Sequence, residues 1–177
     1  PINVIDLKTE KLLPEVHDII ELVAENDVIL DTCHISKKEC MILIPEARRA
    51  GCRKILINHI HLRGITDRAF DPAVDQMLEE SAWTIEEVKQ MVKEGAVMEH
   101  SAAMYVGRRN ETKSLAEFIK EVGANSCEIA SNCGGMHLLH PVETMRYLII
   151  DLLKNGISEA EIETMTKRVP ARLLNLD

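Results

Sequence analysis

The sequence predicts an α/β fold in which short parallel strands alternate with helices in one domain, residues 1–177. Three observations lead to this prediction. Short apolar runs alternate with longer amphipathic segments, Ser/Thr-x-x-Glu capping boxes mark helix starts, and glycines mark helix ends. A chain of 177 residues, 46% of them hydrophobic, is long enough to bury a sizeable core. Five successive strand–helix units favour right-handed crossovers and therefore a parallel sheet.

Five short runs have the composition of strands that are buried on both faces. Each is apolar and rich in β-branched or small residues, as expected for a parallel sheet covered by helices. The predicted strands are Ile2–Ile5, Asp27–Thr32, Lys54–Asn58, Ala96–Glu99 and Cys127–Ser131.

Amphipathic segments between these runs predict the helices. Pro45 is expected to kink or end the helix that contains it, because proline lacks the backbone N–H. The segment Leu62–Ser81 breaks the alternation and is predicted to be a long loop with a short helix over the end of the sheet. The predicted helices are Pro14–Glu25, Ser36–Ala50, Thr84–Gly95, Ser114–Val122, Pro141–Gly156 and one that begins at Ser158.

Composition and charge argue against several classes of partner. A formal charge of −8 and a pI near 5.4 disfavour binding to nucleic acid or to an anionic membrane. Aromatic residues make up only 3% of the chain, too few for a base-stacking surface. No apolar run approaches the roughly 18 residues that a membrane-spanning helix needs. Five cysteines without a Cys-x-x-Cys motif suit free thiols, so we expect a cytoplasmic protein. The expected partner is a small-molecule substrate.

Side chains that bind metals or carry protons follow four of the predicted strands. Active sites of parallel α/β folds lie at the carboxyl ends of the strands, where such side chains converge. All the residues concerned except one asparagine are common metal ligands or proton carriers. They are Cys33 and His34, then His59 and His61, then Glu99 and His100, and finally Asn132 and Cys133.

The histidines suggest a metal site. Zinc is usually held by three protein ligands plus a water when it is catalytic, and it lowers the pKa of that water toward ~7. We favour His34 and His59 as ligands over core histidines bonded to backbone carbonyls. His61 either forms a His-x-His pair with His59 or is simply the first loop residue.

The other candidates have competing interpretations. Glu99 and His100 are neighbours in a strand and point to opposite faces, so only one of them faces the site. Cys33 and Cys133 are more often small buried hydrophobic residues than ligands.

Several motifs resemble the metal-dependent hydrolases of the amidohydrolase superfamily. They are "LDTCHISKKE", "KILINHIH", "SNCGG" and the closing "GISEAEIETMTKRVPARLLNLD". They are most similar to an uncharacterised branch that reads roughly DTGHLS-x-x-E, V-T-H-P, S-T-D-L-G and N-P-A-R-L-L-G-L-D. The similarity runs over essentially the whole chain. It implies a (β/α)8 barrel, of which this chain would be the C-terminal portion, strands four to eight.

The resemblance also implies roles for individual residues. His34 takes the place of the strand-five metal histidine, and His59 takes that of strand six. Asn132 stands where the family has a strand-eight aspartate, which binds metal and accepts a proton from the attacking water. A neutral amide cannot act as that base, so Cys133 or Glu99 would do part of the work. The implied cofactor is a divalent ion, with zinc first and manganese or iron as alternatives.

The resulting hypothesis is a subunit or fragment of a metal-dependent hydrolase that cleaves a C–N, ester or lactone bond. A lyase of the same superfamily, such as a decarboxylase or hydratase, is one alternative. A non-catalytic relative with a binding or assembly role is another, and Asn132 favours it. The five strand–helix units fall short of eight, so we expect a homo-oligomer or a second chain that supplies the N-terminal strands.

Overall fold

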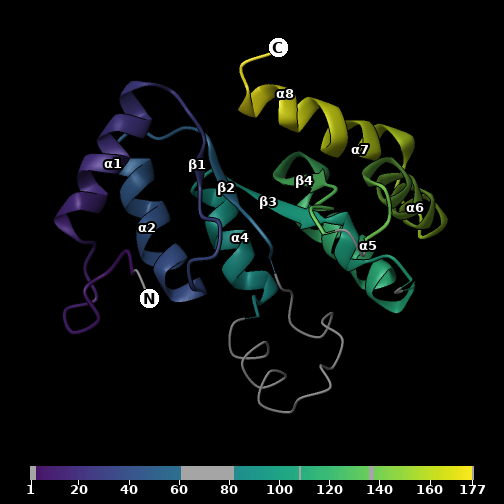
Figure 1. The fold of residues 1–177 in the computed structure, drawn as a ribbon, viewed down its shortest axis with the longest axis horizontal. Helices are drawn as coiled ribbons and strands as arrows, with labels where there is room; N and C mark the ends of the chain where they lie inside the picture. The colour runs from purple at the N-terminus through teal and green to yellow at the C-terminus, as the bar shows by residue number, and fades with distance from the viewer. Residues whose placement is uncertain (1–2, 61–81, 108, 136–137, 177) are drawn as a thin grey trace.

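The computed structural model describes residues 3–60, 82–107, 109–135 and 138–176, and it confirms a mixed α/β fold. Within these ranges the sheet has four parallel strands in the order β1-β2-β3-β4, flanked by helices (Figure 1). This arrangement is consistent with part of a (β/α) barrel. The strands are β1 (Leu30–Asp31), β2 (Ile55–Ile57), β3 (Ala96–Ser101) and β4 (Cys127–Ala130).

The helices begin largely where the capping signals predict. The boxes at Ser36, Thr84 and Ser158 all form, with each side chain accepting from the backbone N–H three residues later. The α-helices are α1 (Pro14–Glu25), α2 (Lys37–Arg49), α4 (Ile85–Lys93), α5 (Arg109–Val122), α6 (Pro141–Lys154), α7 (Glu159–Glu163) and α8 (Val169–Leu173). A π-helical turn, Thr164–Arg168, joins α7 to α8, and short 3₁₀ turns lie at Ala102–Met104 and Ala124–Ser126.

Helix α2 does not end at Pro45, contrary to one sequence-based expectation. It runs on to Arg49 with Pro45 inside it. Proline removes one intrahelical hydrogen bond, but Leu43, Ile44 and Ala47 are almost completely buried on either side of it. Burial of this face holds the helix together across the proline.

The predicted first strand, Ile2–Ile5, is wrong for its described part. Ile5 forms only an isolated antiparallel bridge with Leu12. The carboxylate of Asp6 accepts hydrogen bonds from the backbone N–H groups of Lys8 and Thr9, which turns the chain back on itself. The N–H of Val4 is taken by Glu39 Oε1 on α2, so this segment is held against a helix rather than paired with β1.

The two faces of the sheet have different coverings. Ile57, Met98 and Ile129 point into the main core, which is shared with the helices. The opposite face is called here the inner face. It carries Leu56 of β2, Val97 and Glu99 of β3, and Glu128 of β4. Its amino-terminal part is apolar and packs against Val169 and Leu173 of α8. This smaller cluster consists of Val97, Val169 and Leu173, with Ile29 and Leu56 packed against it. The carboxyl-terminal part of the inner face carries the carboxylates of Glu99 and Glu128.

No helix in the described ranges is both long enough and apolar enough to cross a membrane.

Candidate functional site

Three of the strands end in a residue with a left-handed backbone. Cys33, His59 and Asn132 have φ values of 47°, 51° and 48°, and they follow β1, β2 and β4 at similar places. Side chains other than glycine and asparagine rarely adopt this conformation, and such residues cluster at active sites and ligand-binding loops. At Cys33, the similar family branch has glycine, which adopts this conformation without strain.

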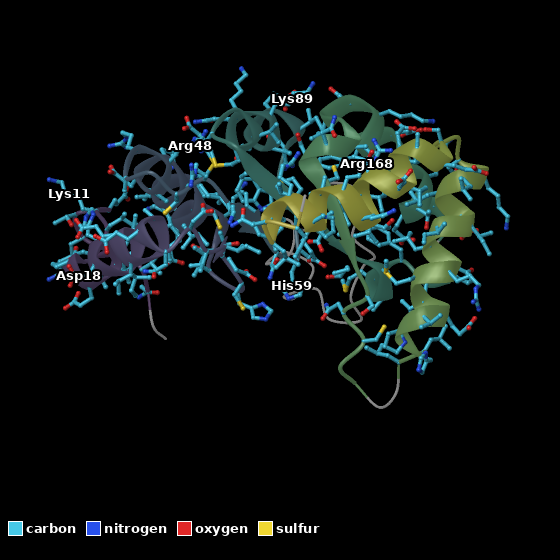
Figure 2. All side chains as sticks on the ribbon, turned by 90° about the horizontal axis from the view of Figure 1, so that it is seen from above. Lys11, Asp18, Arg48, His59, Lys89 and Arg168 are labelled. Carbon is cyan, nitrogen blue, oxygen red and sulfur yellow. The ribbon has the colours of Figure 1, made fainter. Side chains whose placement is uncertain are left out.

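The structure brings His34 and His59 together. Their rings are stacked with centroids 4.8 Å apart and an angle of 20° between the planes. His59 lies near the middle of the molecule, well away from Lys11 and Asp18 at its N-terminal end (Figure 2). Asn132 joins the pair, since its Nδ2 lies 3.4 Å from Nδ1 of His59. Residues from three strand ends therefore meet at one place.

Glu99 is the buried anchor of this group. Its side chain is almost inaccessible, and Oε2 accepts the backbone N–H of His59 at 2.9 Å. Ser101 Oγ donates to the same carboxylate, at 2.9 Å from Oε1. Nδ1 of His59 lies 3.1 Å from that hydroxyl and 3.6 Å from Glu99 Oε2. A buried carboxylate thus holds both the backbone and the ring of His59.

Glu128 is a site residue that the sequence interpretation missed. It lies directly beside Glu99 in the register of β3 and β4, on the same face of the sheet. Burial, the charge of Glu99 and the charge of Asp31 raise the pKa of Glu128 to about 7. The only signal in the sequence is a carboxylate inside a run predicted to be buried on both faces. Its pairing with Glu99 depends on strand register, which the sequence does not reveal.

These side chains line one cavity on the inner face, called here the inner-face pocket. It has a volume of about 340 Å³ and opens at the carboxyl ends of the strands. Its lining residues are Leu56, Asn58, His59, Glu99, Glu128, Ala130 and Asn132. A second cavity of about 240 Å³ lies on the β1 side, and its walls include His34, Lys37 and Trp83. Asn58 and His59 line both cavities.

The remaining predicted site residues are not part of this group. His100 is buried on the other face, with its ring edge-on to Phe118 of α5 at 5.3 Å. Because neighbouring side chains alternate, Glu99 rather than His100 faces the pocket. Cys133 Sγ contacts the carbonyl of Ser131 and the hydroxyl of Thr144 on α6. His61 lies outside the described residues.

The side chains described by the structure do not complete a metal site. Within the described ranges, no group of three or more His, Cys, Asp or Glu side chains is arranged to hold an ion. His34 and His59 supply two imidazoles, whereas a zinc site usually needs at least three protein ligands. The third residue of this cluster is Asn132, whose amide nitrogen points at His59 and is a donor rather than a ligand.

Comparison with known proteins places the chain in a family. Residues 1–99, more than half of the sequence, match the model of a "Family of unknown function (DUF6282)". The chain belongs to this family. No curated protein sequence matches the DUF6282 chain.

A solved structure, an amidohydrolase from Pseudomonas aeruginosa, has a similar fold. The TM-score is 0.64 and the sequence identity is 14%, over 93% of the DUF6282 chain and 57% of the amidohydrolase. The chain thus spans little more than half of that enzyme's length. At this identity the likeness establishes an amidohydrolase-like fold.

Proposed function

We propose that the DUF6282 chain is a hydrolase that cleaves a C–N, ester or lactone bond in a small molecule. The observation that carries the proposal is the meeting of His59, Glu99 and Glu128 in the inner-face pocket. The pocket opens at the carboxyl ends of parallel strands, where enzymes with this architecture have their active sites. The similarity to an amidohydrolase fold supports the same class of reaction by analogy.

In the proposed reaction, His59 acts as general base and Glu128 as general acid. Nε2 of His59 takes a proton from water, and the water oxygen bonds to the carbonyl carbon of the substrate. Glu128 gives its proton to the leaving nitrogen or oxygen as the C–N or C–O bond breaks. With a pKa of about 7, Glu128 is partly protonated at neutral pH, as this role requires. Proton transfer from His59 back to Glu128 through solvent completes the cycle.

Two further groups support these steps. The buried carboxylate of Glu99, with Oε2 3.6 Å from Nδ1 of His59, would stabilise the imidazolium that His59 becomes after it takes the proton. Asn132 is exposed at the rim of the pocket, and its amide has a second hydrogen that can be donated to the carbonyl oxygen of the substrate. A donor at this position would stabilise the negative charge that develops on that oxygen.

A divalent ion remains part of the proposal because the superfamily resemblance implies one. With the ion bound, His34 and His59 would be its described ligands, for zinc or else manganese or iron, and the ion in place of His59 would activate the water or polarise the carbonyl. The described ligand set is incomplete, so none of the steps above passes through the ion. Elemental analysis of the purified protein, compared between wild type and His34→Gln, tests this part separately.

A non-catalytic binding or assembly subunit is the second candidate function. Two observations favour it: Asn132 stands where the similar family branch has aspartate, and the described residues do not form a three-ligand group. A lyase with the same pocket is a variant of the enzyme proposal, since proton transfer by His59 and Glu128 serves both reactions.

The experiment that separates these functions is a substrate screen on the purified chain. Amides, esters and lactones are incubated with the protein alone and with added zinc, manganese or iron. We expect turnover of at least one class, and we expect His59→Gln to abolish it. Absence of turnover in every condition would reject the hydrolase and favour the binding subunit, and release of carbon dioxide or loss of water from a screened acid would indicate a lyase.

We also propose that another polypeptide covers the two ends of the sheet. Within the described residues β1 and β4 each pair on one side only, and α1 and α6 lie at opposite ends of the molecule (Figure 1). Both helices expose apolar side chains, among them Ile19 and Leu22 on α1 and Val142 and Ile150 on α6. An apolar groove of about 610 Å³ runs along α6. Open strand edges and apolar patches of this kind favour association, with a second copy or with a chain that supplies further barrel strands.

A further inference from the structure

The position of every hydrogen around Ser101 follows from its neighbours. The carboxylate of Glu99 only accepts hydrogen bonds, and its two oxygens lie 2.9 Å and 3.1 Å from Ser101 Oγ. The single hydroxyl hydrogen of Ser101 must therefore point at Glu99. Without it, two oxygens with lone pairs would face each other at 2.9 Å in a buried site, where Glu99 and Ser101 are both almost inaccessible.

Ser101 Oγ can then only accept from the other groups around it. Nδ1 of His59 lies 3.1 Å from Oγ, and Nδ2 of Asn132 lies 3.2 Å from it. The Asn132 amide donates one hydrogen, and the remaining lone pair of Oγ accepts from Nδ1 of His59 only if Nδ1 carries a hydrogen. In neutral imidazole one nitrogen is protonated and the other has a lone pair. A hydrogen on Nδ1 leaves the lone pair on Nε2.

We propose that Ser101 is a positioning residue: bonded to Glu99, it keeps the hydrogen of neutral His59 on Nδ1 and presents the Nε2 lone pair for reaction. Nε2 forms no hydrogen bond with the described residues, and the ring borders both cavities. The tautomer itself is independent of the hydrolase assignment. Its use, with Nε2 as the atom that takes a proton from water, rests on the proposed function.

One competing arrangement has to be excluded. If Nδ1 had no hydrogen, it could accept from Asn132 Nδ2 at 3.4 Å while Ser101 still donated to Glu99. That arrangement brings the lone pairs of Nδ1 and Ser101 Oγ within 3.1 Å of each other, where they repel. This contact is shorter than the 3.4 Å hydrogen bond from Asn132 that the arrangement gains. The two arrangements differ in their dependence on Asn132: the proposed one does not need it, and the competing one does.

A second histidine provides an internal control with the opposite tautomer. Nδ1 of His140, at the start of α6, accepts the backbone N–H of Val142 at 3.4 Å. A backbone amide only donates, so neutral His140 carries its hydrogen on Nε2. His17 is exposed on α1 and serves as a solvent-averaged reference.

Nitrogen-15 NMR of the imidazole rings tests the proposal on the full chain. Spectra recorded near pH 8.5, where an ordinary histidine is neutral, distinguish the protonated nitrogen of each ring from the unprotonated one. The His59 signals are identified by their loss in His59→Gln. We expect at least about a tenfold excess of the Nδ1–H form at His59. In the other form, a hydroxyl that turned to Nδ1 would lose its charge-assisted hydrogen bond to Glu99. In Ser101→Ala we expect this excess to be lost, because Glu99 Oε2 at 3.6 Å is too far from Nδ1 to replace the hydroxyl and Asn132 can then donate to an unprotonated Nδ1.

Asn132→Ala and Ser101→Thr are the matched controls, and both should keep the Nδ1–H form. An Nε2–H form in the wild type would overturn the proposal, and so would an unchanged Nδ1–H form in Ser101→Ala. If Ser101→Ala does not fold, Ser101→Cys replaces the hydroxyl with a weak acceptor of similar size and must show the same loss of the Nδ1–H excess. The measurement needs no substrate, so its failure is distinct from failure of the hydrolase assignment.

Discussion

At the scale of single residues, His100 is a buried imidazole whose two nitrogens have no hydrogen-bond partner within the described structure. Burial lowers its pKa to about 3. Between pH 6.5 and pH 3 the unfolded chain binds a proton at this residue and the folded chain does not, so the free energy of unfolding decreases as the pH falls through this range. His100 therefore makes the protein sensitive to acid.

Replacing His100 with leucine should remove this sensitivity. Leucine keeps an apolar contact with Phe118 and has no unpaired nitrogens. We expect His100→Leu to raise the free energy of unfolding, by about 2 kcal/mol more at pH 5 than at pH 8. Urea unfolding at the two pH values measures the difference. An equal effect at both would show that His100 does not titrate as its burial implies.

Cys33 is the second residue whose energetics follow from its environment. A left-handed backbone costs a non-glycine residue about 1–2 kcal/mol. Glycine avoids this strain, but it loses more conformational entropy on folding, which costs about 0.5–1 kcal/mol. Because the side chain is exposed, Cys33→Gly should be neutral to slightly stabilising, whereas the β-branched Cys33→Val should destabilise. Thermal unfolding of both variants tests this, and a clearly lower Tm for Cys33→Gly would contradict it.

At the scale of elements, the register of β3 against β4 sets two carboxylates side by side. The folded chain retains the Glu128 proton between pH 4.5 and about pH 7, whereas the unfolded chain has lost it. The contribution of Glu128 to stability therefore falls as the pH rises through this window. Glu128→Gln should stabilise the protein by about 1–3 kcal/mol at pH 8 and by much less at pH 4, while it lowers any activity.

Urea unfolding of Glu128→Gln at pH 4 and pH 8 is the measurement. Glu15→Gln on α1 is the control, since that exposed carboxylate lies outside the inner-face pocket and should change stability by less than about 0.5 kcal/mol. A Glu128→Gln variant that is less stable than wild type at pH 8 would contradict the carboxyl pair.

The elements also show where prediction from the sequence works and where it stops. Helix starts were predictable because a capping box is a local signal, as at Ser36 and Thr84. The predicted strand at Ile2–Ile5 failed because its apolar composition does not reveal that Asp6 turns the chain back toward Leu12. Strand ends identified the cluster of His34, His59 and Asn132, since parallel strands bring their carboxyl ends together. Glu128 and Ser101 were not found, because their roles depend on pairing between strands that are distant in sequence.

At the scale of the whole molecule, β1 and β4 are the two edges of the sheet, and neither pairs on its outer side within the described part of the chain. Ile150 on α6 and Ile19 on α1 are about half exposed, at ends that a complete barrel would close. We expect the purified chain to form an oligomer larger than 19.9 kDa in light scattering. Ile150→Glu should lower the measured mass while the circular dichroism spectrum stays unchanged, and Leu176→Glu, at an exposed position near the C-terminus, is the control. A wild-type protein that is a stable monomer at all concentrations would contradict association with a second copy and leave a different chain as the partner.

In the proposed function, one pocket built on His59, Glu99 and Glu128 performs hydrolysis. Its most direct test is kcat/KM on the best substrate of the screen for wild type, His59→Gln, Glu128→Gln and His140→Gln. General acid–base roles predict losses of about 10²–10⁴-fold for the first two variants. His140 lies outside the pocket lining, so His140→Gln should retain wild-type activity. Wild-type kcat/KM in His59→Gln would contradict the claim and place the reaction elsewhere in the molecule.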